Sequence, residues 1–233
     1  MNLNNVDSVI TFRGLPWFDL ATSSFVSIGG AGGIGSWLTL FLSRAGVKSY
    51  VYDFDTVESR NLGGQLYMID AIGMAKVNAL AKVIDNFSSL NYMNAKMQLV
   101  EASTPVSSYC FSAFDNMKAR RDMFTAWKRK VSTSGVDAYK SIFIDGRLEA
   151  EFFQIYCVTP NRMERYEATL FDDSEIMETA CSVKQTSHVA AMIGSFMTSF
   201  FTNHLTNISE GMKVREVPFK YEVFLPLIKI YEE

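Results

Sequence analysis

The sequence predicts an α/β protein whose mainly parallel sheet carries helices on both faces. Short apolar runs rich in β-branched and aromatic residues alternate with helical segments through the first 147 residues. That order is expected of parallel strands joined by crossover helices. A glycine cluster, Gly29 to Gly35, separates the first such run from the first helix. This arrangement is typical of the opening unit of a Rossmann-like sheet.

The opening β–α–β unit is predicted from residues 25 to 53. Residues 25–28 form a short strand, and helix-forming residues follow from Ser36 to Arg44. Gly46 is placed to end that helix. Residues 49–53 then predict a second strand that ends in an acid, Asp53.

The alternation continues through the rest of the first half. Apolar spacing predicts helices over 74–90 and 117–130. Three further strands are predicted over 96–100, 109–114 and 141–144. Polar or charged residues follow the last two of these strands, which makes their ends candidates for a ligand site.

The second half changes character. Residues 152–158 predict a strand, and 165–170 are a candidate for another. A long buried helix is expected over 186–205, followed by an edge strand over 217–230, which contains two prolines. We expect these later strands to add antiparallel partners to the parallel sheet.

Length and composition fit a single folded domain over 1–233. The chain has 48% hydrophobic and 20% charged residues, which excludes a disordered protein. The nucleotide-binding half is expected over about 20–147 and a substrate-facing half over about 148–233. A net charge of −3 and a pI near 5.5 provide no field that would attract nucleic acid.

The cysteines and the apolar segments suggest a cytoplasmic setting. The three cysteines form no CxxC pair, so neither a zinc site nor a disulfide framework is expected. The most apolar stretch, 189–201, is interrupted by glycine, serine and threonine and is shorter than the ~20 residues that span a bilayer. No signal peptide is expected in the first 19 residues, and no membrane partner is predicted.

The glycine loop is the first candidate site. Gly30-x-Gly32-x-x-Gly35 between a strand and a helix lets the backbone approach a phosphate and directs helix N–H groups at it. Asp53 follows Gly30 by 23 positions, where a carboxylate can accept a hydrogen bond from a ribose hydroxyl. A tight turn without a ligand is the alternative interpretation.

The segment after Asp53 separates ATP from NAD as the expected ligand. Asp53-Phe-Asp55-Thr-Val-Glu-Ser-Arg60-Asn61-Leu-Gly-Gly-Gln65 is followed by Lys76 and by Asp115-Asn116. In this order the motifs resemble those of the ThiF/MoeB family, adenylyltransferases related to ubiquitin-activating enzymes: a GxGGxG loop, DxDxVxxxNLxRQ, a lysine and an Asp-Asn pair.

The resemblance implies roles for these residues. Lys76 would act as a compact charge on the triphosphate, and Asp115 would hold Mg²⁺ through one carboxylate and several waters. It also implies an ATP site made by Gly30, Gly32, Gly33, Gly35, Asp53, Asp55, Asn61, Gln65, Lys76 and Asn116.

Two departures from the family pattern concern arginines. Gly64 stands where the family has an arginine before the glutamine. Arg60 is a candidate substitute for that charge, and a solvated surface arginine is the alternative. Arg13 is a candidate for a second family arginine that lies in an N-terminal helix. The paired CxxC motifs of larger members are missing, so the chain resembles the short, zinc-free type.

Arg147 and Cys181 are candidates for contact with the acyl substrate. Arg147 follows a predicted strand end and could hold a carboxylate bidentately, with a structural ion pair to Glu149 or Glu151 as the alternative. Cys181 precedes the long helix, where relatives often carry a reactive cysteine, and Lys184 could lower its pKa. A small buried residue is the alternative for Cys181.

The remaining chemically active side chains are expected to be structural. Cys110 and Cys157 fall in apolar strands and are predicted to be inert core residues. The spacing of His188 and His204 fits neither a metal pair nor a catalytic pair with Cys181. The basic residues Arg120-Arg121 and Lys128-Arg-Lys130 are predicted to form a solvated helix face.

Taken with the resemblance, the sequence predicts an ATP- and Mg²⁺-dependent adenylyltransferase. Its expected partner is the C-terminal tail of a small ubiquitin-like or sulfur-carrier protein, and a homodimer is expected because the 189–201 helix is apolar nearly all round. Three alternatives remain open: a non-catalytic nucleotide-binding protein, an enzyme that activates a non-protein carboxylate such as a tRNA modification intermediate, and an NAD-dependent oxidoreductase.

Overall fold

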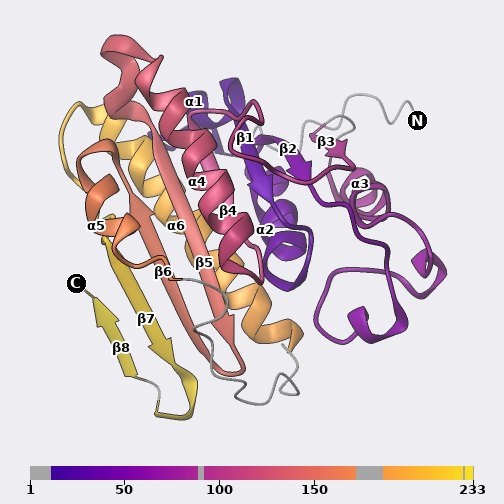
Figure 1. Ribbon diagram of the computed structural model, residues 1–233. Coiled ribbons are helices and arrows are strands. Elements are labelled where there is room, and N and C mark those ends of the chain that lie inside the picture. The colour runs from indigo at the N-terminus through magenta and orange to yellow at the C-terminus, as the bar shows by residue number, and fades with distance from the viewer. Residues whose placement is uncertain (1–11, 89–91, 172–185, 228, 233) are drawn as a thin grey trace.

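One mixed sheet forms the centre of the molecule (Figure 1). The computed structural model describes residues 12–88, 92–171, 186–227 and 229–232. The sheet order is β3-β2-β1-β4-β5-β6-β7-β8, parallel from β3 to β5 and antiparallel from β5 to β8. The strands are β1 (Phe25–Gly29), β2 (Lys48–Tyr52), β3 (Met93–Lys96), β4 (Tyr109–Ser112), β5 (Ile142–Glu149), β6 (Phe152–Val158), β7 (Lys220–Phe224) and β8 (Lys229–Glu232). The predicted fold class is confirmed.

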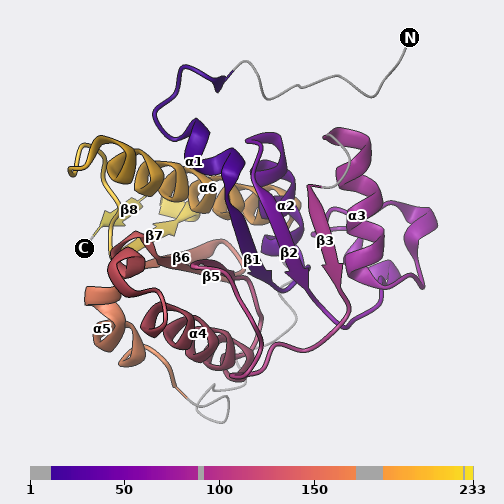
Figure 2. The same ribbon diagram turned by 90° about the horizontal axis from the view of Figure 1, so that it is seen from above.

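Helices cover both faces of the sheet (Figure 2). One layer contains α1 (Phe18–Ser23), α2 (Gly33–Arg44), α3 (Lys76–Phe87) and α6 (Ser187–Glu210). The other layer contains α4 (Met117–Ser132) and α5 (Met163–Glu167). Each layer has its own apolar core against the sheet, as expected for crossover helices on a parallel sheet.

Helix α6 is covered within this chain. Val189, Ile193, Met197 and Phe201 are fully buried, because α6 packs on β5 and β6 and lies beside α2 in the same layer. Gly194 allows the close approach of α2, since a Cβ atom there would lie 3.0 Å from the Leu38 backbone nitrogen. The apolar character of α6 therefore does not require a second chain, although it suggested one in the sequence.

Four predicted elements differ from the structure. The strand predicted over 141–144 continues to Glu149 as β5, so Asp145 and Arg147 lie within it rather than beyond its end. Strand β3 ends at Lys96, where the prediction began, so residues 97–105 form a connection rather than a strand. Residues 165–170 do not form a strand, because α5 covers 163–167 and its Tyr166 ring fills the core beneath α4. The predicted edge strand is two strands, β7 and β8, joined through the short helix η8 (Leu225–Leu227), where Pro226 lies.

Two further predictions concern the burial of Cys110 and Cys157 and the possibility of a membrane-spanning helix. Cys110 in β4 and Cys157 in β6 are fully buried, and burial raises the pKa of both thiols well above the ordinary range. They are core residues, as predicted. No helix in the part of the chain that the structure describes has the length and apolar character needed to cross a membrane.

Candidate functional site

The glycine loop joins β1 to α2 and lies against the end of β4. Gly30 has φ +89°, a conformation that favours glycine. A Cβ atom at Gly30 would lie 2.8 Å from the Ala113 carbonyl oxygen, and one at Gly35 would collide with the Gly30 carbonyl. The Ala113 N–H donates to the Gly29 carbonyl at 2.8 Å. The glycines thus allow the loop to pack closely on β4 and start α2 with its N–H groups pointing outward.

Asp53 lies at the carboxyl end of β2, beside this loop. Its Oδ2 accepts a hydrogen bond from the Ala31 N–H at 2.7 Å, and its Oδ1 accepts one from the Asp55 N–H at 2.8 Å. Both oxygens are fixed in this way, yet each retains a lone pair for a further donor. Asp53 is half-buried, so a ribose hydroxyl can reach it.

Lys76 begins α3 and pairs with Asp55. Its Nζ lies 2.8 Å from Asp55 Oδ2, and the lysine side chain is 9% exposed while that of Asp55 is 50% exposed. The Lys76 N–H also donates to the Asp55 carbonyl, and Thr56 pairs with Ala75 in a short bridge. The acidic segment is therefore fastened to the start of α3, which places one cation beside the glycine loop.

The next turn, η3 (Ser59–Asn61), holds two candidate residues. Asn61 Oδ1 accepts a hydrogen bond from the Glu58 N–H at 2.8 Å, while the Glu58 side chain accepts one from the Asn61 N–H. Arg60 is 70% exposed, and its Nε lies 2.6 Å from Glu58 Oε2. Asn61 thus shapes this turn, and Arg60 is paired with Glu58 rather than being a free surface cation.

Gln65 and Gly64 complete the segment. Gly64 is buried, and its carbonyl accepts a hydrogen bond from the Trp37 indole at 3.2 Å. Gln65 Oε1 is buried and lacks a hydrogen-bond partner among the residues that the structure describes. A buried acceptor without a donor is uncommon in a native protein and suggests a bound group or water.

Asp115 and Asn116 follow β4. Asn116 caps α4, because its Oδ1 accepts a hydrogen bond from the Ala119 N–H at 2.8 Å. Its Nδ2 donates to Asp115 Oδ1 at 3.2 Å. Asp115 is exposed, so its carboxylate is oriented from one side and open on the other.

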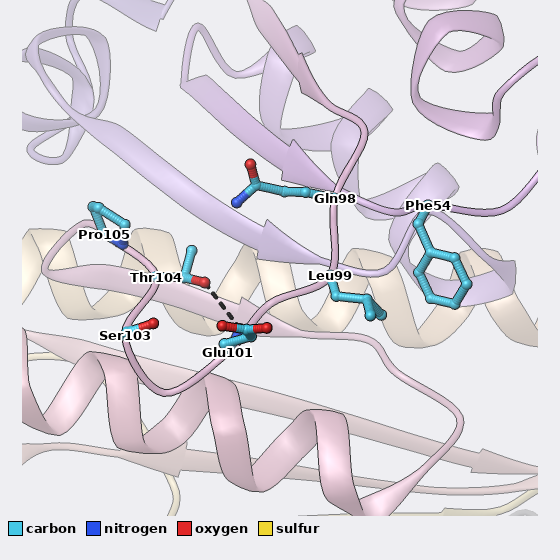
Figure 3. Close-up of a pocket in the computed structure, with 7 residues that line it drawn as sticks. All are labelled: Phe54, Gln98, Leu99, Glu101, Ser103, Thr104 and Pro105. Atoms are coloured by element: carbon cyan, nitrogen blue, oxygen red, sulfur yellow. Dashed lines mark hydrogen bonds between the residues drawn. The ribbon is translucent and has the colours of Figure 1, made fainter.

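An open hollow lies next to the end of β2 (Figure 3). Its volume is about 590 Å³, and Phe54, the residue after Asp53, forms one wall. The other lining residues come from the connection after β3: Gln98, Leu99, Glu101, Ser103, Thr104 and Pro105. Arg129 of α4 donates to the Ser103 and Thr104 carbonyls, which holds this connection in place.

Arg147 was predicted to follow a strand end, but it lies within β5 and belongs to a buried charge network. Its Nε lies 2.8 Å from Asp145 Oδ2, and its Nη atoms donate to the carbonyl and hydroxyl of Thr169. The expected ion-pair partners, Glu149 and Glu151, are both exposed, so the partner is Asp145 instead. Contact of Arg147 with a substrate stays a prediction, since most of its N–H groups already have acceptors.

Arg120 is not solvated, so that prediction is wrong. It is 5% exposed, pairs with the fully buried Asp145, and donates to the Phe114 and Gly146 carbonyls. Tyr166 donates to the same carboxylate at 2.9 Å. Burial alone would raise the pKa of Asp145, but Arg120 and Arg147 hold it below its ordinary value. The spacing of buried α4 residues at 117, 120, 124, 127 and 131 could have revealed Arg120.

The remaining candidates are Arg13, the histidines and the segment around Cys181. Cys181 and Lys184 fall outside the described residues. Arg13 lies in an exposed turn before α1 rather than in a helix. His188 is exposed, whereas His204 is buried and its Nε2 lies 2.7 Å from the Lys140 carbonyl oxygen. Among the described residues, no cluster of three His, Cys, Asp or Glu side chains could hold a metal.

The motifs around the glycine loop match one known family. The ThiF family model matches residues 18–223, which is most of the chain. The chain belongs to the ThiF family. That assignment covers the glycine loop, the acidic segment, the α3 lysine and the Asp-Asn pair, so the resemblance of these motifs to that family is confirmed.

Curated relatives match over a shorter part. Ubiquitin-like modifier-activating enzyme 5 of Aedes aegypti is 31% identical over 120 residues, which is 43% of this chain and 30% of that protein. The Culex quinquefasciatus protein of the same name is 36% identical over 75 residues, or 32% of this chain and 17% of that protein. The matches therefore cover less than a third of either relative.

Solved structures share the fold over nearly the whole chain. The PaaA structure has a TM-score of 0.69 at 16% identity and covers 94% of this chain and 66% of its own. The structure of E. coli MccB with ATP has a TM-score of 0.67 at 15% identity, covering 94% and 65%. The E. coli tRNA N6-threonylcarbamoyladenosine dehydratase TcdA has a TM-score of 0.64 at 15% identity, covering 88% and 95%. At these identities the likeness establishes the fold alone.

Proposed function

We propose that this ThiF-family chain is an adenylyltransferase that activates a carboxylate with ATP. A carboxylate oxygen attacks the α-phosphorus, the bond from that phosphorus to the bridging oxygen breaks, and pyrophosphate leaves. The products are an acyl-adenylate and pyrophosphate. Such a reaction depends on positioning and on charge neutralisation more than on a general base.

The placement of three side chains around one loop carries this proposal. Asp53 and Asp115 follow β2 and β4, the two neighbours of β1, and the glycine loop follows β1 itself. The carboxyl ends of parallel strands meet at one edge, at the point where the strand order reverses. Lys76 reaches the same edge through its pair with Asp55. Asp53 would then bind the ribose, Lys76 would neutralise phosphate charge, and Asp115 would hold the metal.

The hollow beside Phe54 would take the base of the nucleotide. It begins at the residue after the ribose acid, and its lining combines aromatic and aliphatic surface with Gln98 and Glu101. Asn61 and Gln65 would contact the phosphate side, which would give the buried Gln65 Oε1 a partner through a bound water or metal. Gly30, Gly32, Gly33 and Gly35 would present backbone N–H groups to the phosphates.

Mg²⁺ fits the groups present. Asp115 offers one exposed, oriented carboxylate, and protein-bound Mg²⁺ typically uses one or two carboxylates together with phosphates and waters. When bound, the ion would neutralise charge on the leaving pyrophosphate. Asn116 would keep the Asp115 carboxylate in position, because its amide donates to that group.

For the substrate, we propose the C-terminal carboxylate of a small ubiquitin-like or sulfur-carrier protein in the cytoplasm. The name of the curated relatives, ubiquitin-like modifier-activating enzyme 5, supports a protein substrate. E. coli MccB, solved with AMPCPP and MccA, supports a polypeptide partner. The acidic net charge of this chain gives no support to an RNA-linked carboxylate.

Pyrophosphate exchange tests the proposal. The chain with Mg²⁺, ATP and a panel of Gly-Gly-ended carrier proteins should incorporate labelled pyrophosphate into ATP, and EDTA should stop it. Calorimetry should show ATP binding that weakens with EDTA. Tight NAD binding without ATP binding would reject the proposal. ATP binding with no exchange on any carboxylate would favour the non-catalytic alternative, in which Gly64 in place of an arginine has removed turnover.

Cys181 is proposed to accept the activated acyl group after adenylation, or the outer sulfur of a donor persulfide, whose remaining thiolate leaves. Thiolate attack on the adenylate carbonyl would form a thioester and release AMP. In a Cys181→Ala variant, exchange should persist while a thiol-sensitive adduct and later transfer disappear. Unchanged transfer would make Cys181 structural.

A homodimer remains part of the proposal, although α6 does not require it. The exposed apolar residues that a second chain could cover include Met68, Ile69 and Ile72, in and beside η4 (Ile69–Ala71). Light scattering at micromolar concentration should give twice the 26.2 kDa chain mass. The mass of one chain alone would count against the dimer.

A further inference from the structure

Residues 64–67, which include the position of the missing family arginine, are hydrogen-bonded to the glycine loop and to the start of α2. Three hydrogen bonds make this connection, and each joins the segment to a residue between 31 and 37. They run from Trp37 Nε1 to the Gly64 carbonyl at 3.2 Å, from the Leu66 N–H to Ser36 Oγ at 3.0 Å, and from the Tyr67 hydroxyl to the Ala31 carbonyl at 2.5 Å.

The third bond acts on the phosphate loop itself. Ala31 is held on both sides, because its N–H donates to Asp53 and its carbonyl accepts from Tyr67. The carbonyl of a trans peptide points away from the N–H of the next residue. With the Ala31 carbonyl directed at Tyr67, the Gly32 N–H must point the other way.

There is open space at Gly32. A Cβ atom at Gly32 would find no atom within 4 Å, and α2 begins at the next residue, Gly33. Without the Tyr67 bond, the peptide between two small residues could flip and turn its carbonyl toward the phosphates. A carbonyl oxygen there would repel an anion that an N–H group would bind.

Tyr67 is suited to hold this peptide. Its side chain is 9% exposed, and burial together with the nearby Asp53 and Asp55 raises its pKa well above that of a free tyrosine. The hydroxyl therefore keeps its proton and remains a donor. Neither Tyr67 nor Ser36 belongs to the motifs by which the sequence resembles the family.

We propose that Tyr67 is a positioning residue, which fixes the Ala31–Gly32 peptide so that its N–H faces the phosphates of the bound nucleotide. The inference rests on the proposed nucleotide site and extends it to a residue outside the motifs. Tyr67 should affect only the binding of the phosphates. In the proposed site, Asp53 binds the ribose and the hollow beside Phe54 takes the base.

A Tyr67→Phe variant removes one oxygen and tests this assignment. Calorimetry with ATP and with adenosine should show ATP bound about tenfold more weakly, the expected size for loss of one such hydrogen bond, and adenosine bound as in the wild type. Tyr109→Phe is the matched control, because Tyr109 begins β4, at the opposite end of that strand from the loop. It should leave both affinities unchanged, and thermal unfolding of each variant should confirm that the fold is intact.

The outcomes separate the possibilities. Equal loss of ATP and adenosine affinity would mean that Tyr67 supports the site only generally, and an unchanged ATP affinity would mean that it does not orient the loop. Either result overturns the proposal while leaving the proposed function standing. A wild-type chain that binds neither ligand would overturn both.

Discussion

Asp115 and Asp145 look alike in the sequence, since each follows or ends an apolar strand run and each precedes a small polar or glycine residue. In the structure they differ completely. Asp115 is exposed, and the Asn116 amide donates to its carboxylate. Asp145 has no exposed surface and is held by two arginines and a tyrosine hydroxyl.

The two acids belong to neighbouring strands of one sheet, since Asp115 follows β4 and Asp145 lies within β5, yet they have different roles. The metal role proposed for Asp115 needs a carboxylate with an open side, and Asp115 has one. Asp145 is neutralised by charges within the fold, and Arg120 ties it to the Phe114 carbonyl, immediately before Asp115. The buried acid therefore supports the loop on which the exposed acid acts.

The largest expected effect is on stability, at Asp145. Asp145→Asn keeps the shape but leaves Arg120 and Arg147 without a counterion, which should cost about 3–5 kcal/mol of unfolding free energy. Urea unfolding measures this loss. Asp115→Asn is the control, and its free energy of unfolding should lie within about 0.5 kcal/mol of the wild-type value. Similar midpoints for the two variants would contradict the contrast between the two acids.

The pH dependence of stability offers a second test of the contrast between Asp115 and Asp145. The pKa of Asp145 is lowered in the folded state, so its contribution is present above its ordinary value of 3.8 and is lost as the pH falls through the lower folded value. Wild type should therefore lose stability more steeply in acid than Asp145→Asn does. If wild type and Asp145→Asn lost stability equally steeply in acid, another group would control acid unfolding.

The next effect is on turnover, at Asp115 and Lys76. Asp115→Asn and Lys76→Ala should each lower pyrophosphate exchange by a factor on the order of 10²–10³, because both groups serve charge that develops in the reaction. Thermal unfolding should show a folded protein in both cases. Near-normal exchange in either variant would remove that residue from the mechanism.

A smaller effect is expected at Arg60. It is 70% exposed and paired with Glu58, so it is a weaker source of charge than the buried Lys76. We expect Arg60→Ala to lower exchange only a few-fold, roughly the range of a screened surface charge, and Glu58→Gln to leave the fold intact. A loss as large as that of Lys76→Ala would establish Arg60 as the substitute for the arginine replaced by Gly64.

The smallest effect concerns His204. Burial lowers its pKa, so the folded state favours the neutral imidazole and the unfolded state binds more protons below the ordinary value of 6.5. Stability should fall, by at most about 1.4 kcal/mol, as the pH drops from roughly 7.5 to roughly 5.5. His204→Gln should reduce this change. An equal change in the variant would assign the titration to other groups.

Much of the first half was predictable because its signals are local. The glycine loop, Asp53 and the α2 helix follow from backbone sterics and from apolar spacing, which act within a few residues. The strand after α3 was placed too late, because Met97 and Leu99 resemble strand residues although both are exposed, and Leu99 lines the open hollow beyond the end of β2. The end of β3 depends on where its partner strand β2 ends, and the sequence around β3 does not carry that information.

By itself, the sequence determined the α/β class, the family and the position of the glycine loop, since these rest on short motifs with fixed spacing. Only the tertiary structure decided which charges are buried and paired. Arg120 contacts Asp145 across 25 positions, and Tyr67 reaches Ala31 across 36. Burial and pairing depend on which distant segments pack together, so the roles of Arg120, Asp145 and Tyr67 became visible only when the sheet brought their partners to one edge.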